Sequence, residues 1–175
     1  SSVSAFLLNR SSDLLLYINS VTGRNMLLWN GGCHVHEKFS VEAIVKLKQK
    51  HPEAVVMAHL ECKAPVLAVA DVKGSTATML HYAQEHPEIK EYIIATEAGI
   101  LHELERNCPN VIFYPVPPEV SEGGVGCSCN ECEYMKMNTL KKIYNALKFG
   151  WPTVEVAPEI AKKAVKPIEK MLSLS

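Results

Sequence analysis

From about Lys38 onward, short apolar runs of strand length alternate with segments of helical periodicity, and this order constrains the fold more than any other feature. The apolar runs lie at residues 54–58, 92–95 and 111–114. Strands that alternate with helices pair in parallel through right-handed crossovers, and helices then cover the sheet. The sequence therefore predicts an α/β fold, a three-layer αβα domain with a parallel sheet.

Helix start and stop signals lie between these runs. Ser40 can cap a helix over residues 41–50, and Pro65 can open a short helix. A further helix follows Thr76 and stops before Pro87. The apolar stripe of the first helix is expected to be Val41, Ile44, Val45 and Leu47. Later helices are predicted at residues 98–107, over a stripe of Met137, Leu140, Ile143, Tyr144 and Leu147, and from Pro158, with a kink at Pro167.

The two ends of the chain differ from this central pattern. Residues 26–29 form a plausible strand, but no complete strand-helix unit precedes it, so residues 1–35 are interpreted as the C-terminal remnant of a preceding α/β domain. Residues 36–132 are predicted to be a complete α/β domain that ends in a cysteine-rich loop. Residues 133–175 are predicted to form C-terminal helices, the first of which ends at Gly150.

Charge and hydropathy exclude several classes of protein. The 18 Lys and Arg residues are balanced by 19 Asp and Glu residues, which gives no basic surplus for nucleic acid. The apolar runs fall far short of the roughly 20 residues that a membrane helix needs. The apolar residues near Phe6 lack the basic region and cleavage site of a secretory signal. We therefore expect a cytoplasmic protein with neither nucleic acid nor membrane as partner.

The cysteines are unevenly distributed. Cys127, Cys129 and Cys132 lie within six positions, while the other three cysteines lie far upstream. In a reducing compartment such crowding favours metal ligation over a disulfide framework, because close thiolates can share a soft metal ion or an iron-sulfur cluster. Structural zinc is the first alternative, although Cys33, Cys62 or a histidine would have to supply the fourth ligand. A thiol-disulfide switch is a weaker alternative.

Polar residues follow three predicted strands where each strand ends. Ligands bind at the carboxyl ends of parallel strands, so these residues are candidates for one shared site. They are Cys33, His34 and His36 after Trp29, His59, Glu61 and Cys62 after Ala58, and Thr96 and Glu97 after Ala95. Taken singly, each is more simply a solvated loop residue, but their recurrence favours a site. Ser75 and Thr76 could bind an anion at a helix N-terminus, although an ordinary N-cap is the simpler interpretation.

Several longer motifs resemble those of the quinolinate synthase family, in family order over roughly residues 22–147. Gly32-Cys33-His34-Val35-His36 resembles the family's Gly-x-Cys-x-Val-His, and Ala58-His59-Leu60-Glu61-Cys62 resembles its Ala-His-Pro-Glu-Cys. The other matching runs are Ala70-Asp71, Gly74-Ser75-Thr76, Met79-Leu80, Ala95-Thr96-Glu97-Ala98-Gly99-Ile100-Leu101-His102, and Cys132 followed by Met135-Lys136-Met137-Asn138-Thr139-Leu140. Residues 1–20 match poorly, and Leu60 replaces the family's proline.

The resemblance implies a transferase of NAD biosynthesis that condenses iminoaspartate with dihydroxyacetone phosphate to give quinolinate, phosphate and water. Three similar α/β domains would surround a central [4Fe-4S] cluster, in a pseudo-threefold arrangement. One cysteine from each third of the enzyme would hold the cluster, and one iron would stay open as a Lewis acid. A possible protein partner is the enzyme that supplies iminoaspartate.

Individual roles follow from the same resemblance. Cys33 and Cys132 correspond to the middle and last cluster ligands. The first ligand and the N-terminal substrate contacts have no counterpart, so the isolated chain is expected to be inactive. His59 and Glu61 correspond to catalytic residues that also contact substrate, and Ser75 and Thr76 correspond to a substrate-binding pair. Cys127 and Cys129 would either be redox-active or simply flank Cys132, and the resemblance places neither of them in the cluster.

Overall fold

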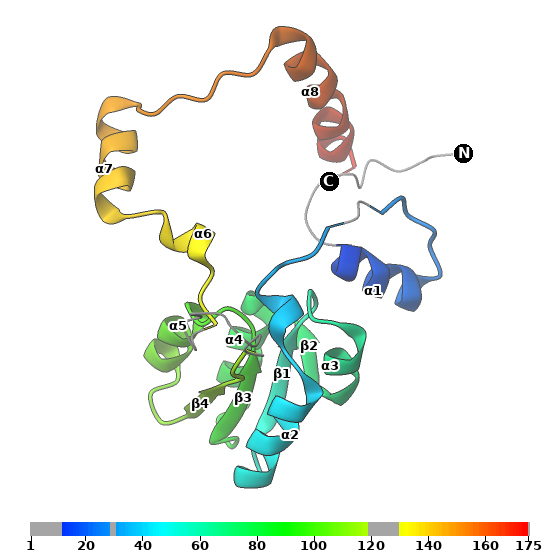
Figure 1. Cartoon of the computed structure of the whole chain (residues 1–175), viewed down its shortest axis with the longest axis vertical. Coiled ribbons are helices and arrows are strands. Elements are labelled where there is room, and N and C mark those ends of the chain that lie inside the picture. The colour runs from blue at the N-terminus through cyan, green and yellow to red at the C-terminus, as the bar shows by residue number, and fades with distance from the viewer. Residues whose placement is uncertain (1–11, 29–30, 119–129, 175) are drawn as a thin grey trace, which may run out of the picture. The chain divides into compact units, whose positions relative to one another are not determined.

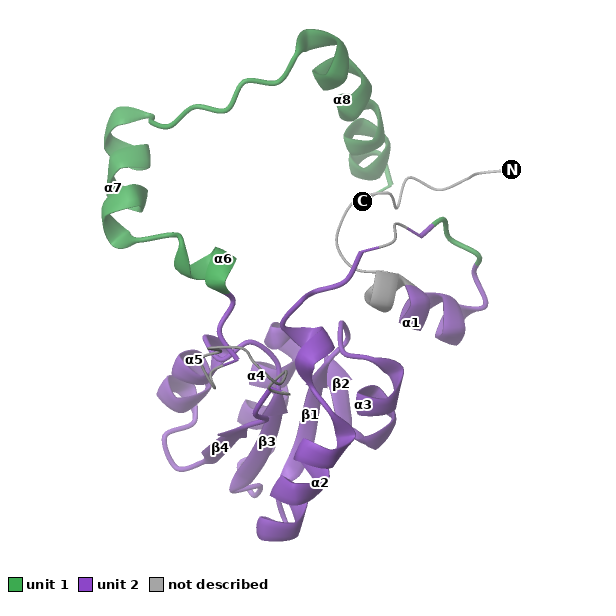
Figure 2. Ribbon diagram, in the orientation of Figure 1, with its two compact units in different colours: residues 1–9, 25–27, 133–175 green, residues 10–24, 28–132 purple. Residues whose placement is uncertain are grey.

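The computed structural model describes residues 12–28, 31–118 and 130–174 (Figure 1). The chain divides into two compact units. The larger unit comprises Arg10–Arg24 and Leu28–Cys132, and the smaller one comprises Ser1–Asn9, Asn25–Leu27 and Glu133–Ser175 (Figure 2). Every candidate site residue that the structure describes belongs to the larger unit.

The larger unit is built on a four-stranded parallel sheet with strand order β2-β1-β3-β4. The strands are β1 (Val55–His59), β2 (Val72–Gly74), β3 (Glu91–Ala95) and β4 (Ile112–Pro115). The central pair β1 and β3 aligns Val56 with Ile93 and Ala58 with Ala95. The predicted α/β class is therefore confirmed, and β2 is an additional edge strand that the apolar pattern did not indicate.

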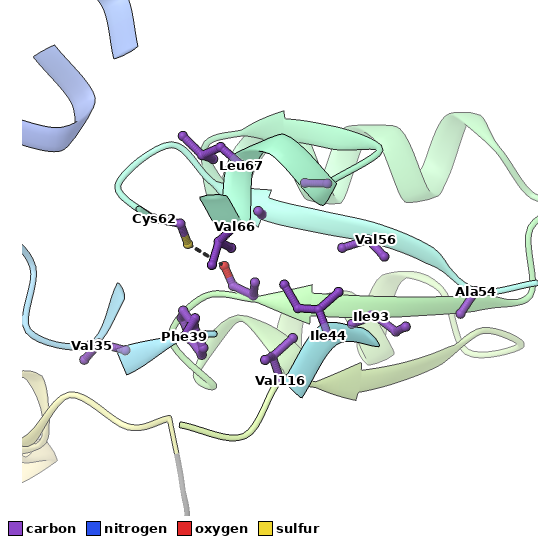
Figure 3. Close-up of a cluster of buried hydrophobic side chains, with 13 residues drawn as sticks. Val35, Phe39, Ile44, Ala54, Val56, Cys62, Val66, Leu67, Ile93 and Val116 are labelled. Atoms are coloured by element: carbon purple, nitrogen blue, oxygen red, sulfur yellow. Dashed lines mark hydrogen bonds between the residues drawn. The ribbon is translucent and has the colours of Figure 1, made fainter. Parts of the chain in front are cut away.

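Helices cover both faces of this sheet (Figure 1). On one face lie α2 (Val41–Lys50) and α3 (Ala64–Val69), and on the other lie α4 (Thr76–Glu85) and α5 (Ile100–Asn107). Successive strand side chains point to opposite faces, so each central strand contributes to two cores. The core on the α2 side, drawn in Figure 3, includes Ile44, Val56, Ala58, Val66, Ile93, Ala95 and Val116. The core on the α4 side includes Met57, Met79, Ala83, Tyr92, Ile94, Leu104 and Phe113.

Helix α2 begins where the cap predicted. The Ala43 N–H donates to Ser40 Oγ at 3.3 Å, which satisfies one of the amides that the first turn leaves unpaired. Ile44 is buried, but Val45 is 44% exposed, so its predicted place in the apolar stripe is wrong. Consecutive helical residues are rotated by about 100°. Val45 therefore turns away from the sheet when Ile44 faces it.

The amino-terminal region departs from the prediction. Helix α1 (Ser12–Thr22) lies where no helix was expected, and residues 26–28 form no strand. Leu27 is 72% exposed, so this segment has neither the burial nor the neighbouring strand that a β-strand requires. Trp29 lies outside the described residues. The 3-10 helix η1 (His36–Lys38) then leads into α2.

The smaller unit contains α6 (Glu133–Lys136), α7 (Leu140–Phe149) and α8 (Pro158–Leu172). Thr139 Oγ1 caps α7 by accepting from the Lys142 N–H at 3.2 Å, and Gly150 ends it in the left-handed conformation with φ of 63°. Helix α8 begins at Pro158 as predicted and continues past Pro167. Within the described residues, no helix has the length and apolar character needed to cross a bilayer.

Leu104→Ala should destabilise the larger unit by about 2–5 kcal/mol, because it removes a fully buried side chain from the α4-side core and leaves a cavity. Leu147→Ala is the matched control, since Leu147 is 84% exposed, and it should change stability by about 0.5 kcal/mol or less. Urea denaturation followed by circular dichroism measures both. Equal losses would contradict the assigned core.

Candidate functional site

The loop after β1 is fixed across the ends of three strands. The Cys62 N–H donates to His59 O at 2.9 Å, and the Cys62 thiol donates to Ala95 O at the end of β3 at 3.4 Å (dashed line in Figure 3). The Leu60 N–H donates to Gly74 O, at the end of β2, at 3.3 Å. A proline at position 60 could not make this last bond. Leu60 therefore lacks the fixed backbone angle that the family's proline would impose, but its N–H restrains the loop through this hydrogen bond.

A compact turn brings Cys33 and His36 to the same edge. Cys33 O accepts from the Glu37 N–H at 3.0 Å, and Val35 O accepts from the Lys38 N–H at 3.2 Å. Residues three apart in such a tight turn project to the same side. Val35 is buried in the α2-side core, so the turn is anchored to the sheet.

Two other segments of the chain converge on the side chain of His36. Its Nε2 lies 2.9 Å from Thr96 Oγ1, just beyond β3, and its Nδ1 lies 3.2 Å from Glu61 Oε2 in the loop after β1. The His59 ring stacks on the His36 ring with centroids 4.5 Å apart. His36, Thr96, Glu61 and His59, which all follow predicted strand ends in the sequence, therefore form one cluster.

The protonation of His59 follows from its surroundings. Its Nδ1 accepts a hydrogen bond from the Glu61 N–H at 3.2 Å. Burial lowers the pKa of His59, the neighbouring His36 lowers that pKa further, and Glu61 opposes both effects. The lowered pKa favours the uncharged imidazole at neutral pH, and the hydrogen bond to Nδ1 places its proton on Nε2.

Cys33 and Cys132 both lie partly buried in the larger unit, 99 positions apart, and both pack against the α2-side core. The Cys132 N–H donates to Glu97 Oε1 at 3.2 Å, while Glu97 Oε2 accepts from the Gly99 N–H at 2.7 Å. One carboxylate therefore ties the Cys132 segment to the end of β3. All four described cysteines are thiols, which suits soft metal chemistry, whereas Cys127 and Cys129 lie outside the described residues.

Ser75 acts as the N-cap of α4. Its Oγ accepts from the Thr78 N–H at 3.2 Å, and His59 pairs with the preceding Gly74 in the sheet. Ser75 and the exposed Thr76 therefore lie at the same edge of the sheet as His59. A Cβ on Gly74 would lie 2.5 Å from Thr78 Cβ, so the close start of α4 requires glycine there.

Two contributors to the cluster were not assigned a role from the sequence. Thr96 and His36 were noted only as polar residues after strand ends, and they contact each other across 60 positions. The available signal was the spacing Cys33-x-x-His36, which places two metal-binding residue types on one turn. The contact of His36 with Glu61 joins the turn before α2 to the loop after β1, and local spacing does not reveal it.

Comparison with known proteins gives a consistent family. The family model described as Quinolinate synthetase A protein matches residues 7–173. The chain is 42% identical over 91% of its length to a quinolinate synthase of Microcystis aeruginosa, of which it covers 48%. It is 44% identical over 91% of its length to one of Nostoc punctiforme, covering 47% of it. The chain thus spans about half the length of the curated relatives it matches.

Proposed function

Since the chain belongs to the quinolinate synthetase A family, we propose that the polypeptide containing it is a quinolinate synthase. It would act in the cytoplasm in NAD biosynthesis, condensing iminoaspartate with dihydroxyacetone phosphate. The observation that carries the proposal is the convergence of Cys33, His59 and Glu61 at the carboxyl edge of the sheet, where parallel sheets bind ligands. We also propose the domain boundaries that the sequence suggested, in which residues 36–132 form the domain that carries the site.

Cys33 and Cys132 would be this chain's ligands to a [4Fe-4S] cluster. Their thiols are partly buried beside one core, and a thiolate is the usual protein ligand of iron-sulfur clusters. When bound, the cluster supplies an open iron as a Lewis acid. Glu97 would keep the Cys132 backbone in position through its hydrogen bond.

His59 and Glu61 would move protons during the dehydrations. The uncharged His59 can donate its Nε2 proton to a leaving oxygen, and the Glu61 carboxylate can accept a proton from carbon or nitrogen. Glu61 Oε2 lies 3.8 Å from His59 Nδ1, so the two groups act on neighbouring parts of one substrate. The packed His36 ring limits rotation of His59.

Ser75 and Thr76 would hold a carboxylate or phosphate of the substrate. Both are exposed at the start of the ten-residue helix α4, where unpaired amides and the helix dipole favour a negative charge. Ser75 and Thr76 directly follow Gly74, which pairs with His59 in the sheet. An anion bound there would therefore be held at a fixed position relative to the proton-transfer groups.

Anaerobic reconstitution with iron and sulfide tests the cluster ligands. In a preparation that forms quinolinate, Cys33→Ser and Cys132→Ser should each abolish the stable brown absorption and the turnover. Cys108→Ser is the matched control, because that thiol is buried in the α4-side core and burial raises its pKa. Stoichiometric zinc in a colourless, inactive protein would favour the alternative, a zinc module built on Cys127, Cys129 and Cys132.

A further inference from the structure

We propose that Cys33, His36 and Glu61 form a second kind of metal site, one that binds a single divalent transition-metal ion of the zinc class without any cluster. The three residues offer one sulfur, one nitrogen and one oxygen atom, and these atoms lie within 4.8 Å of one another. Cys33 and His36 lie in the turn before α2, and Glu61 lies in the loop after β1. Both segments are fixed to the sheet.

The spacing of the ligand atoms is close to that of a tetrahedral ion. Zn–S is about 2.3 Å and Zn–N and Zn–O about 2.0–2.1 Å, which puts tetrahedral ligand atoms about 3.3–3.6 Å apart. His36 Nδ1 and Glu61 Oε2 already lie 3.2 Å apart. Cys33 therefore needs only a modest rotation to complete a three-ligand site.

The second observation is that His36 Nδ1 is buried without a hydrogen-bond partner. The side chain is only 6% exposed, and its contact with Glu61 Oε2 is short but lacks hydrogen-bond geometry. When Nε2–H donates to Thr96 Oγ1, Nδ1 presents its lone pair toward the Glu61 carboxylate. Two electron-rich atoms at that distance repel each other, and a cation between them removes the repulsion. The hydroxyl of Thr96 then supplies the outer hydrogen bond that a metal-bound histidine usually makes.

The donor types select the ion. One thiolate, one imidazole and one carboxylate suit zinc or cobalt better than magnesium or calcium, which prefer oxygen ligands. Three protein ligands leave the fourth position for water, as in zinc sites of the open type. His59 stacks on His36 and so covers one face of the imidazole that would bind the ion.

This site competes with the proposed cluster, because both need the Cys33 thiolate. That consequence rests on the proposed function, whereas binding of a single ion does not. Zinc held by Cys33, His36 and Glu61 would keep the protein in a cluster-free form until iron and sulfide displace it.

Cobalt titration of the reduced, iron-free chain tests the proposal. One equivalent of Co²⁺ should bind and give a thiolate-to-cobalt charge-transfer band and intense tetrahedral d–d bands. Glu61→Gln and Cys33→Ser should each weaken Co²⁺ binding by more than about 100-fold. Loss of an outer hydrogen bond typically lowers metal affinity by about 10- to 100-fold, and loss of a ligand lowers it further. Thr96→Val, which removes only the outer hydrogen bond, should weaken Co²⁺ binding by about 10- to 100-fold. Far-UV circular dichroism checks that each variant is folded.

Cys132→Ser is the discriminating control. In the chain alone it should leave Co²⁺ affinity and the charge-transfer band unchanged, and in a preparation that forms quinolinate it should remove the proposed cluster. Glu61→Gln should lose cobalt in the first preparation but keep the cluster in the second. Loss of cobalt in Cys132→Ser, or unchanged binding in folded Glu61→Gln, would overturn the mononuclear site. Failure of every cluster preparation alongside normal cobalt binding would instead contradict the proposed function alone.

Discussion

Residues 1–175, purified without any other polypeptide, are expected to form no quinolinate after anaerobic reconstitution. The motif match gives this chain only two cluster cysteines, Cys33 and Cys132, where the family resemblance implies three. Cys62 cannot readily take the third place, because its buried thiol already donates to Ala95 O. The chain spans about half the length of its curated relatives, and a site built from that half alone would admit water and weaken the electrostatic interactions that stabilise a transition state. We therefore expect unstable iron binding together with no turnover.

Product analysis by mass spectrometry, with iron and sulfide measured on the same sample, checks this expectation. A full-length relative such as the quinolinate synthase of Microcystis aeruginosa serves as the positive control. Adding the remaining half of that relative to residues 1–175 should increase both iron content and product. Quinolinate formed by residues 1–175 alone would show that the site is complete within them.

Loss of the His59 imidazole should lower turnover by about 10²- to 10⁴-fold, the usual contribution of general acid-base catalysis. The variant is His59→Ala in a preparation that forms quinolinate. The proposed cluster is held by cysteine thiolates and not by His59. The backbone O of residue 59, which accepts from the Cys62 N–H, is still present after the substitution. The cluster content should therefore stay close to that of the unaltered protein while turnover falls.

His102→Ala is the matched control for this substitution, because His102 is exposed on α5. Its turnover should not change. Glu61→Gln should also lower turnover more than it lowers iron content. A proton-transfer role for His59 would be untenable if His59→Ala kept full turnover, or if its iron content and turnover fell in parallel.

Most of the larger unit could be predicted because local signals agreed with the packing. Strands β1, β3 and β4 lie on continuous apolar runs, and the caps of α2 and α4 lie at residues with suitable side chains. Strand β2 was missed because Val72-Lys73-Gly74 has no apolar run, and pairing with β1 alone makes it a strand. Residues 26–28 show the converse, since this apolar run pairs with none of the described strands and forms no strand.

The candidate site divides in the same way. Residues with a local motif, such as His59 and Glu61, could be nominated from their place after a strand. The contact between His36 and Thr96 and the bond from Cys132 to Glu97 join segments 60 and 35 positions apart. Such pairings depend on the register of β1 against β3 and on the path of the chain after β4, so they required three-dimensional information.

The strand order has a consequence for how different parts of the site respond to thermal opening. Strands β1 and β3 occupy the centre of the sheet and support His59, Glu61 and Thr96, whereas β2 is an edge strand of three residues that leads directly to Ser75. Edge elements open at lower free energy than central ones, so amides near Ser75 should exchange with solvent deuterium sooner than those of β1. The end of the site that we propose holds the anion can therefore open and adjust to substrate, while the central strands keep the proposed proton-transfer groups in register.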